Sequence, residues 1–101
     1  MKKRLFIKIY GDVIGVGFRY NTKRMAGELG IFGYASNCQD NTLEIEAEGE
    51  EAQLEDFLSW CRLGPTTARV AKIEFKWLDN KNEFREFIIK LGLTRLRKIN
   101  E

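Results

Sequence analysis

Two helical segments, each placed between strand-like segments, are the feature of this sequence that most constrains its fold. Apolar side chains recur at helical spacing from Phe18 to Leu29, and again from Glu50 to the break at Gly64-Pro65. Strand-like segments precede, separate and follow the two helices, which gives the order β-α-β-β-α-β. Two β-α-β halves predict an α+β ferredoxin-like sandwich, in which a four-stranded, mainly antiparallel sheet carries both helices on one face.

The strand-like segments of this plan are expected at residues 5–10, 31–38, 42–48 and 70–78. A last strand is predicted at residues 84–90, so one domain of residues 1–90 holds every predicted element. Residues 91–101 form a C-terminal extension of unknown role. The pattern fits a short docked helix, an added strand or a solvated terminus, and it favours the solvated terminus.

Residues 42–48 alternate between apolar residues and three glutamates, Glu44, Glu46 and Glu48. Alternation of this kind predicts an antiparallel strand with one face in the core and the acidic face in solvent. An acidic outer face would repel phosphates, whereas a sheet that binds RNA usually presents exposed aromatic side chains. The alternation therefore favours neither a catalytic carboxylate cluster nor an RNA-binding strand.

Composition excludes several kinds of chemistry. The chain has 101 residues and no histidine, and its two cysteines, Cys38 and Cys61, are too few for a metal site. Serine–histidine, cysteine–histidine and phosphohistidine mechanisms are therefore excluded. We expect no metal and no cofactor, and two free, buried thiols rather than a disulfide.

Charge and hydropathy limit the partners. The 17 basic and 15 acidic residues give a net charge of +2, which does not support nucleic-acid binding through charge alone. No apolar run approaches the roughly 20 residues that span a bilayer. The first apolar run is short and contains Lys8, so it is typical of a strand and not of a signal peptide. We expect a cytoplasmic monomer without a membrane partner.

The glycine-rich stretch at residues 11–19, Gly-Asp-Val-Ile-Gly-Val-Gly-Phe-Arg, joins the first strand to the first helix. Glycines allow positive φ, so successive backbone amides can face one concavity, and the start of a helix adds unpaired amides. Arg19 can complete such an anion site with a forked, charged donor. By itself the stretch also fits an ordinary turn beside an exposed arginine. The candidate amides are those of Gly15, Val16, Gly17, Phe18 and Arg19.

Asn37 stands near the end of the second predicted strand, just before the hairpin turn at Asp40-Asn41. Asparagine is common in turns and caps, which is the simpler interpretation. Its amide also both donates and accepts hydrogen bonds, so it can hold a water molecule in place. Both interpretations are open from this residue alone.

Two ordered segments carry a resemblance to a known family. Residues 11–19 resemble the first signature of the acylphosphatases, and residues 29–37, Leu-Gly-Ile-Phe-Gly-Tyr-Ala-Ser-Asn, are similar to the second. The resemblance extends over roughly residues 4–90 in the family's order. There are departures: Ile14 stands where a glutamine is usual, and Asn41 replaces the usual turn glycine.

The resemblance implies an enzyme that hydrolyses the carboxyl–phosphate bond of small acyl phosphates, without a metal, to a carboxylate and inorganic phosphate. It implies that Arg19 and the loop amides bind the phosphoryl group and that Asn37 orients the attacking water. The chemistry is compatible with this composition, because a carboxylate whose conjugate acid has a pKa of about 4 leaves without a general acid. Positioning and charge stabilisation then suffice.

Two other classes of function use the same fold. A non-catalytic phosphate- or nucleotide-binding module would need the loop but not Asn37. An RNA-binding or protein-interaction domain would use the sheet face or the basic extension, and its RNA binding would weaken with salt.

Overall fold

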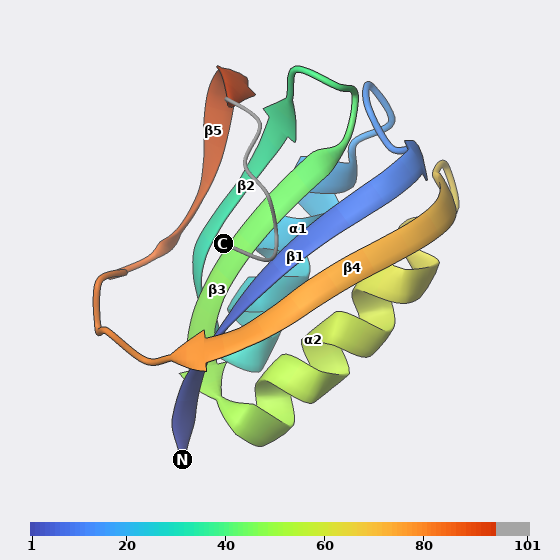
Figure 1. Cartoon of the computed structure of the whole chain (residues 1–101). Helices are drawn as coiled ribbons and strands as arrows, with labels where there is room; N and C mark the ends of the chain where they lie inside the picture. Colours follow the sequence, from blue (N-terminus) through green and yellow to red (C-terminus); the bar gives the residue numbers. More distant parts are fainter. Residues whose placement is uncertain (95–101) are drawn as a thin grey trace.

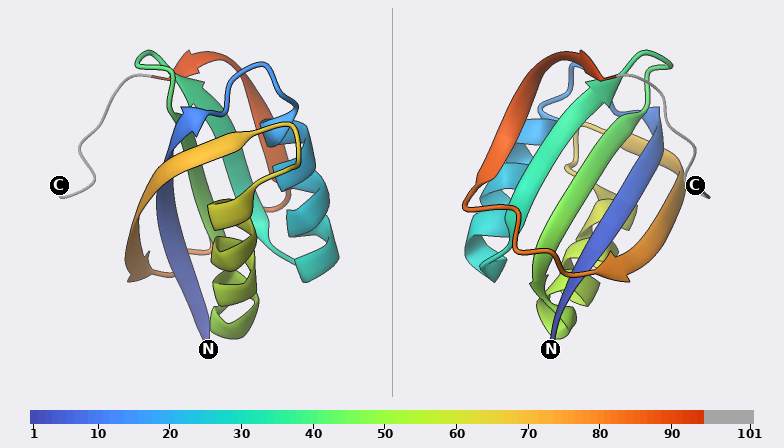
Figure 2. Two further views of the ribbon diagram at one scale, coloured as in Figure 1. Left: turned by 90° about the vertical axis from the view of Figure 1, so that its right-hand side faces the viewer. Right: turned by 60° about the vertical axis from the view of Figure 1, so that its left-hand side comes forward.

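The computed structural model describes residues 1–94 and shows a single twisted sheet with two helices packed against one of its faces (Figure 1). Along the chain the elements are β1 (Lys2–Asp12), α1 (Phe18–Leu29), β2 (Phe32–Cys38), β3 (Leu43–Glu50), α2 (Glu51–Leu63), β4 (Arg69–Asp79) and β5 (Phe87–Thr94). Figure 2 shows both helices on the same side of the sheet. The predicted ferredoxin-like arrangement is confirmed.

The sheet has five strands in the order β4-β1-β3-β2-β5, one strand more than predicted for the sandwich. The first four strands pair antiparallel, whereas β5 lies parallel to β2. The chain must therefore cross from the β4 edge to the β5 edge, and residues 80–86 make this crossover at one end of the sheet (Figure 1).

Helix α1 has the predicted bounds and the predicted buried side. Its buried residues are Phe18, Thr22 and Ala26, and Gly30 ends it in a left-handed conformation. The Phe18 ring meets the Trp60 ring of α2 edge-on, with 5.6 Å between centroids. Aliphatic side chains of β1 and β3 complete the core under both helices.

The three glutamates of β3 correct a sequence-based expectation. Glu44, Glu46 and Glu48 are only 3%, 5% and 6% exposed, so the predicted solvated face is wrong. The physical reason is that polar side chains of the neighbouring strands compensate the buried carboxylates. Arg4 of β1 lies opposite Glu48 in register and forms ion pairs with Glu46 and Glu48, and the Tyr34 hydroxyl of β2 donates a hydrogen bond to Glu44. Charged side chains can be buried where partners of opposite charge and hydrogen bonds compensate them.

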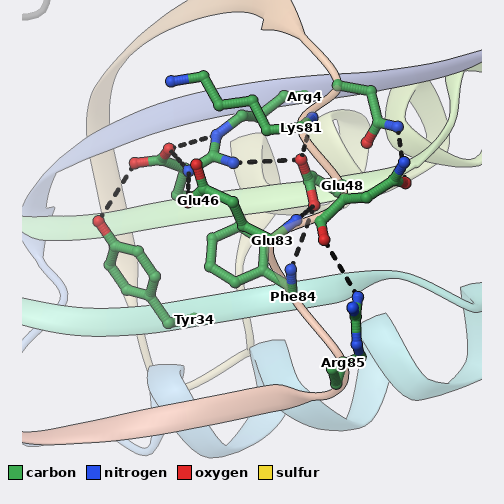
Figure 3. A network of polar contacts seen from close by, with 10 residues as sticks. Arg4, Tyr34, Glu46, Glu48, Lys81, Glu83, Phe84 and Arg85 are labelled. Atoms are coloured by element: carbon green, nitrogen blue, oxygen red, sulfur yellow. Dashed lines mark hydrogen bonds and ion pairs between the residues drawn. The ribbon is translucent and has the colours of Figure 1, made fainter.

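The crossover segment covers part of this charged face (Figure 3). Arg4 forms ion pairs with both Glu46 and Glu48, and its guanidinium lies 4.8 Å from the centre of the Phe84 ring. Glu48 also accepts hydrogen bonds from the backbone amides of Lys81 and Glu83, at 2.7 and 3.0 Å. A buried carboxylate on β3 therefore holds the crossover in place.

The last strand begins and ends later than predicted. The prediction placed it at residues 84–90, whereas β5 runs from Phe87 to Thr94 and so includes the first residues of the predicted extension. Residues 95–101 lie outside the described residues, and the division into a domain of residues 1–90 and an extension stays a prediction. Within residues 1–94, no helix has the length and apolar character needed to cross a membrane.

Candidate active site

The loop between β1 and α1 has the backbone that the glycine pattern predicted. Gly15 and Gly17 have φ angles of 73° and 76°, in the left-handed region that side-chain-bearing residues rarely adopt. Gly17 is the residue directly before α1, and its carbonyl accepts hydrogen bonds from the Asn21 backbone and side-chain amides at 3.0 and 2.9 Å. Such a loop at a helix start is suited to hold an anion.

Contacts from the segment between α2 and β4 support the loop. The Thr67 hydroxyl donates to the Val16 carbonyl at 2.6 Å. The ring of Phe18 lies so close to Gly64 that a Cβ there would stand 2.7 Å from it. The break after α2, expected only as a helix stop, thus also brings a supporting segment against the loop.

The two side chains singled out in the sequence line one cavity of about 150 Å³, although they come from different elements. Arg19 lies in the first turn of α1 and Asn37 on β2, and the cavity also reaches Gly15 and Gly17 of the loop. In Figure 1 the loop, the end of β2 and the end of β5 all lie at the same end of the sheet. The structure therefore brings Arg19 and Asn37 together with Gly15, Gly17 and Phe18, whereas Val16 lines a separate hollow.

Arg19 is held by the last strand. One guanidinium nitrogen, Nη1, donates to the backbone carbonyl of Lys90 on β5 at 2.7 Å. A guanidinium has five N–H donors, so this contact orients the side chain and leaves donors for a ligand in the cavity.

Asn37 is half-buried on a strand with neighbours on both sides, opposite Leu43 of β3 and Leu93 of β5. The pairing with β5 is irregular between Ala35 and Asn37, and irregularities of this kind re-aim side chains. Among the described residues, the side-chain amide of Asn37 forms no hydrogen bond. It is therefore available to a ligand or a water molecule in the cavity.

Three further lining residues were not identified as site residues from the sequence, and one of them is Val13 of the loop. Tyr20, from the exposed side of α1, and Ile89, from β5, both line the cavity. No local pattern marks Ile89, because it reaches the site only through the parallel pairing of β5 with β2.

Other candidate chemistry has no support within residues 1–94. There, no group of three histidine, cysteine or acidic side chains is placed to hold a metal ion. Both cysteines are free and buried, as predicted. Burial raises the pKa of the Cys38 thiol and that of the Cys61 thiol, which makes both weak nucleophiles near neutral pH.

Comparison with known proteins shows the family of this chain. The family model described as Acylphosphatase matches residues 5–89. The chain belongs to the acylphosphatase family. It is 39% identical to an acylphosphatase of Caldanaerobacter subterraneus subsp. tengcongensis over 88% of this chain and 99% of the relative.

Further relatives fall in the same family. An acylphosphatase of Thermococcus kodakarensis is 42% identical over 73% of this chain and 81% of the relative. The crystal structure of acylphosphatase from Bacillus subtilis superposes with a TM-score of 0.84 at 30% identity, over 89% of this chain and 99% of that chain. Membership makes the chain an enzyme, an acylphosphatase, and so a hydrolase.

Proposed function

We propose that this protein hydrolyses small acyl phosphates in the cavity between α1 and β2, with Arg19 and Asn37 in distinct roles. The observation that carries the proposal is that both side chains, from separate segments of the chain, line one cavity at a loop with two left-handed glycines. A small cationic cavity of this kind suits a phosphoryl group.

The holding role belongs to the loop and Arg19. The amides of Gly15, Val16, Gly17, Phe18 and Arg19 and the guanidinium of Arg19 bind the phosphoryl oxygens. Because the Lys90 carbonyl fixes the guanidinium, the charge is in place before the transition state forms. Preorganised charge of this kind is the largest contribution available to a site without a general acid.

The water-positioning role belongs to Asn37. Its amide holds a water molecule for in-line attack on phosphorus. The water oxygen forms a bond to phosphorus as the bond from phosphorus to the carboxyl oxygen breaks. The carboxylate leaves with the electron pair, and a phosphoryl oxygen takes up the water proton, which yields inorganic phosphate. No covalent enzyme intermediate and no metal is required.

The test is release of phosphate from benzoyl phosphate in the presence of a chelator. The unaltered protein should turn over, and Arg19→Gln should lower kcat/KM by about 10³-fold, as for other arginines that stabilise phosphoryl transfer. Circular dichroism of the variant should show an unchanged fold. Absence of phosphate release by the unaltered protein would contradict the proposal, and tight phosphate binding without turnover would favour a non-catalytic phosphate-binding module.

The RNA-binding alternative has less support. Its usual signature is aromatic side chains exposed on the central strands. On the inner strand β1, Phe6 is only 2% exposed, and the other aromatic side chain, Tyr10, is half-buried and donates a hydrogen bond to Glu74. The neighbouring strand β3 presents buried glutamates rather than stacking surfaces.

A further inference from the structure

A second, wider hollow borders the cavity that we propose for the phosphoryl group. It has a volume of about 470 Å³ and is lined by Ile14 and Val16 of the loop, Thr67 after α2 and Arg69 at the start of β4. Val13 lines both hollows. The two are therefore neighbours with a common wall, and we call the second one the outer groove.

Residues of the loop alternate between the two hollows. Gly15 and Gly17 line the cavity, whereas Ile14 and Val16 line the outer groove. The cavity side of the loop thus offers bare backbone, which suits phosphoryl oxygens. The groove side offers two partly buried aliphatic side chains, which suit a carbon skeleton.

The outer groove also contains two opposite charges. Asp12 and Arg69 lie directly across from one another in the β1–β4 pairing, and both are exposed. Within residues 1–94 neither side chain takes part in an ion pair. The guanidinium of Arg69 therefore has its forked donors free for a ligand carboxylate. The shorter Asp12 side chain contributes the opposing charge.

The geometry of in-line displacement indicates on which side of phosphorus the leaving group departs. The attacking and leaving oxygens stand on opposite sides of phosphorus. Asn37, the proposed water holder, lines the cavity and not the outer groove. The acyl group must therefore leave on the side away from Asn37. The outer groove, which adjoins the cavity at Val13 and is not lined by Asn37, is the neighbouring hollow that can receive it.

We infer that the acyl group of the substrate lies in the outer groove against Ile14 and Val16, and that Arg69 favours acyl groups that carry a second carboxylate. The inference rests on the proposed function and names a substrate class for it, the monoacyl phosphates of dicarboxylic acids. Arg69 acts here as a specificity-determining residue, separate from the holding role of Arg19.

The test compares two rigid substrates, 4-carboxybenzoyl phosphate and benzoyl phosphate. The ratio of their kcat/KM values is the carboxylate preference. Arg69→Gln should lower this preference by roughly three- to tenfold, the range of an exposed charge-assisted contact. Arg69→Lys should retain only part of it, because the ammonium keeps the charge and loses the forked donors, and Asp12→Asn should raise it. Arg85→Gln, an exposed arginine of the crossover segment, is the matched control and should keep the value of the unaltered protein.

The contact between the acyl group and Ile14 is tested by a separate measurement. Ile14→Ala should lower kcat/KM for benzoyl phosphate relative to acetyl phosphate by at least about threefold, because the ring loses buried apolar area.

Three outcomes decide the matter. A carboxylate preference that falls in Arg69→Gln but not in Arg85→Gln supports the inference. Hydrolysis of benzoyl phosphate with the same preference in both variants overturns the inference and leaves the proposed function standing. If the unaltered protein does not hydrolyse benzoyl phosphate, the proposed function fails and the inference fails with it.

Discussion

Gly15 illustrates how a single backbone conformation supports the site. Its φ is 73°, and a Cβ added there would meet no atom within 4 Å. The need for glycine is therefore conformational and not steric. A residue with a Cβ is destabilised in the left-handed region. Such a residue would shift the backbone of the loop and move its amides away from the arrangement that binds oxygens.

Replacing Gly15 by alanine should lower the free energy of unfolding by about 1–2 kcal/mol, the usual cost of a left-handed alanine. It should also weaken inhibition by inorganic phosphate. Gly15→Asn should cost less, since asparagine tolerates this region better. Urea unfolding and inhibition kinetics provide the two measurements.

The matched control is Gly27, which lies inside α1 with nothing within 4 Å of an added Cβ. Gly27→Ala should raise stability by about 0.5–1 kcal/mol, because alanine favours the helix. If Gly15→Ala behaved like Gly27→Ala, the loop would not depend on the left-handed conformation.

At the level of elements, β3 and the crossover depend on one buried carboxylate. Burial acts to raise the pKa of Glu48, but backbone amides of residues 81, 83 and 84 and the Arg4 guanidinium donate hydrogen bonds to it and hold the pKa below its ordinary value. The ionised form is thus the form that the fold requires. Its loss would release the segment that leads into β5.

Stability should accordingly fall in acid. A carboxylate with a lowered pKa in the folded state stabilises the fold fully above its unfolded pKa, near 4.5, and this contribution disappears as pH falls through the lower folded pKa. Glu48→Gln should remove this dependence and cost about 3 kcal/mol at pH 7, as when one partner of a buried ion pair is removed.

Urea unfolding from pH 3 to pH 7 measures both effects. Glu55→Gln, on the exposed side of α2, should follow the unaltered protein. Equal acid sensitivity in Glu48→Gln and the unaltered protein would show that other groups carry the pH dependence.

These elements also show what could be predicted from the sequence. Helix α1 could be predicted with its bounds, because the stripe beginning at Phe18 and the stop at Gly30 are local signals. The burial of Glu46 could not be predicted, because alternation shows which residues share a face and not what covers that face. The cover comes from Arg4 and from the crossover, which are distant in sequence.

For the molecule as a whole, the order of strands in the sheet determines which segments of the chain lie next to one another at the site. Arg19 and Asn37 each lie in a recognisable signature, so both could be predicted as site residues. The Lys90 carbonyl that holds Arg19, and the wall contributed by Ile89, could not. Both depend on β5 pairing with β2 after a crossover of the whole sheet.

The packed molecule should also protect its thiols. Cys38 on β2 and Cys61 on α2 are free and buried, so a thiol reagent such as Ellman's reagent should not react with the native protein. Both thiols should react in denaturant. Fast reaction of either thiol under native conditions would contradict the packing described for β2 or for α2.

The most direct test of the central claim separates the two proposed roles by comparing Asn37→Ala with the unaltered protein. With benzoyl phosphate as substrate, kcat should fall by about 10²-fold or more, because the water is no longer positioned. The inhibition constant for inorganic phosphate should stay within about twofold, because the loop and Arg19 still hold the phosphate. An unchanged kcat, or loss of phosphate inhibition in parallel with kcat, would contradict the division of labour between Arg19 and Asn37.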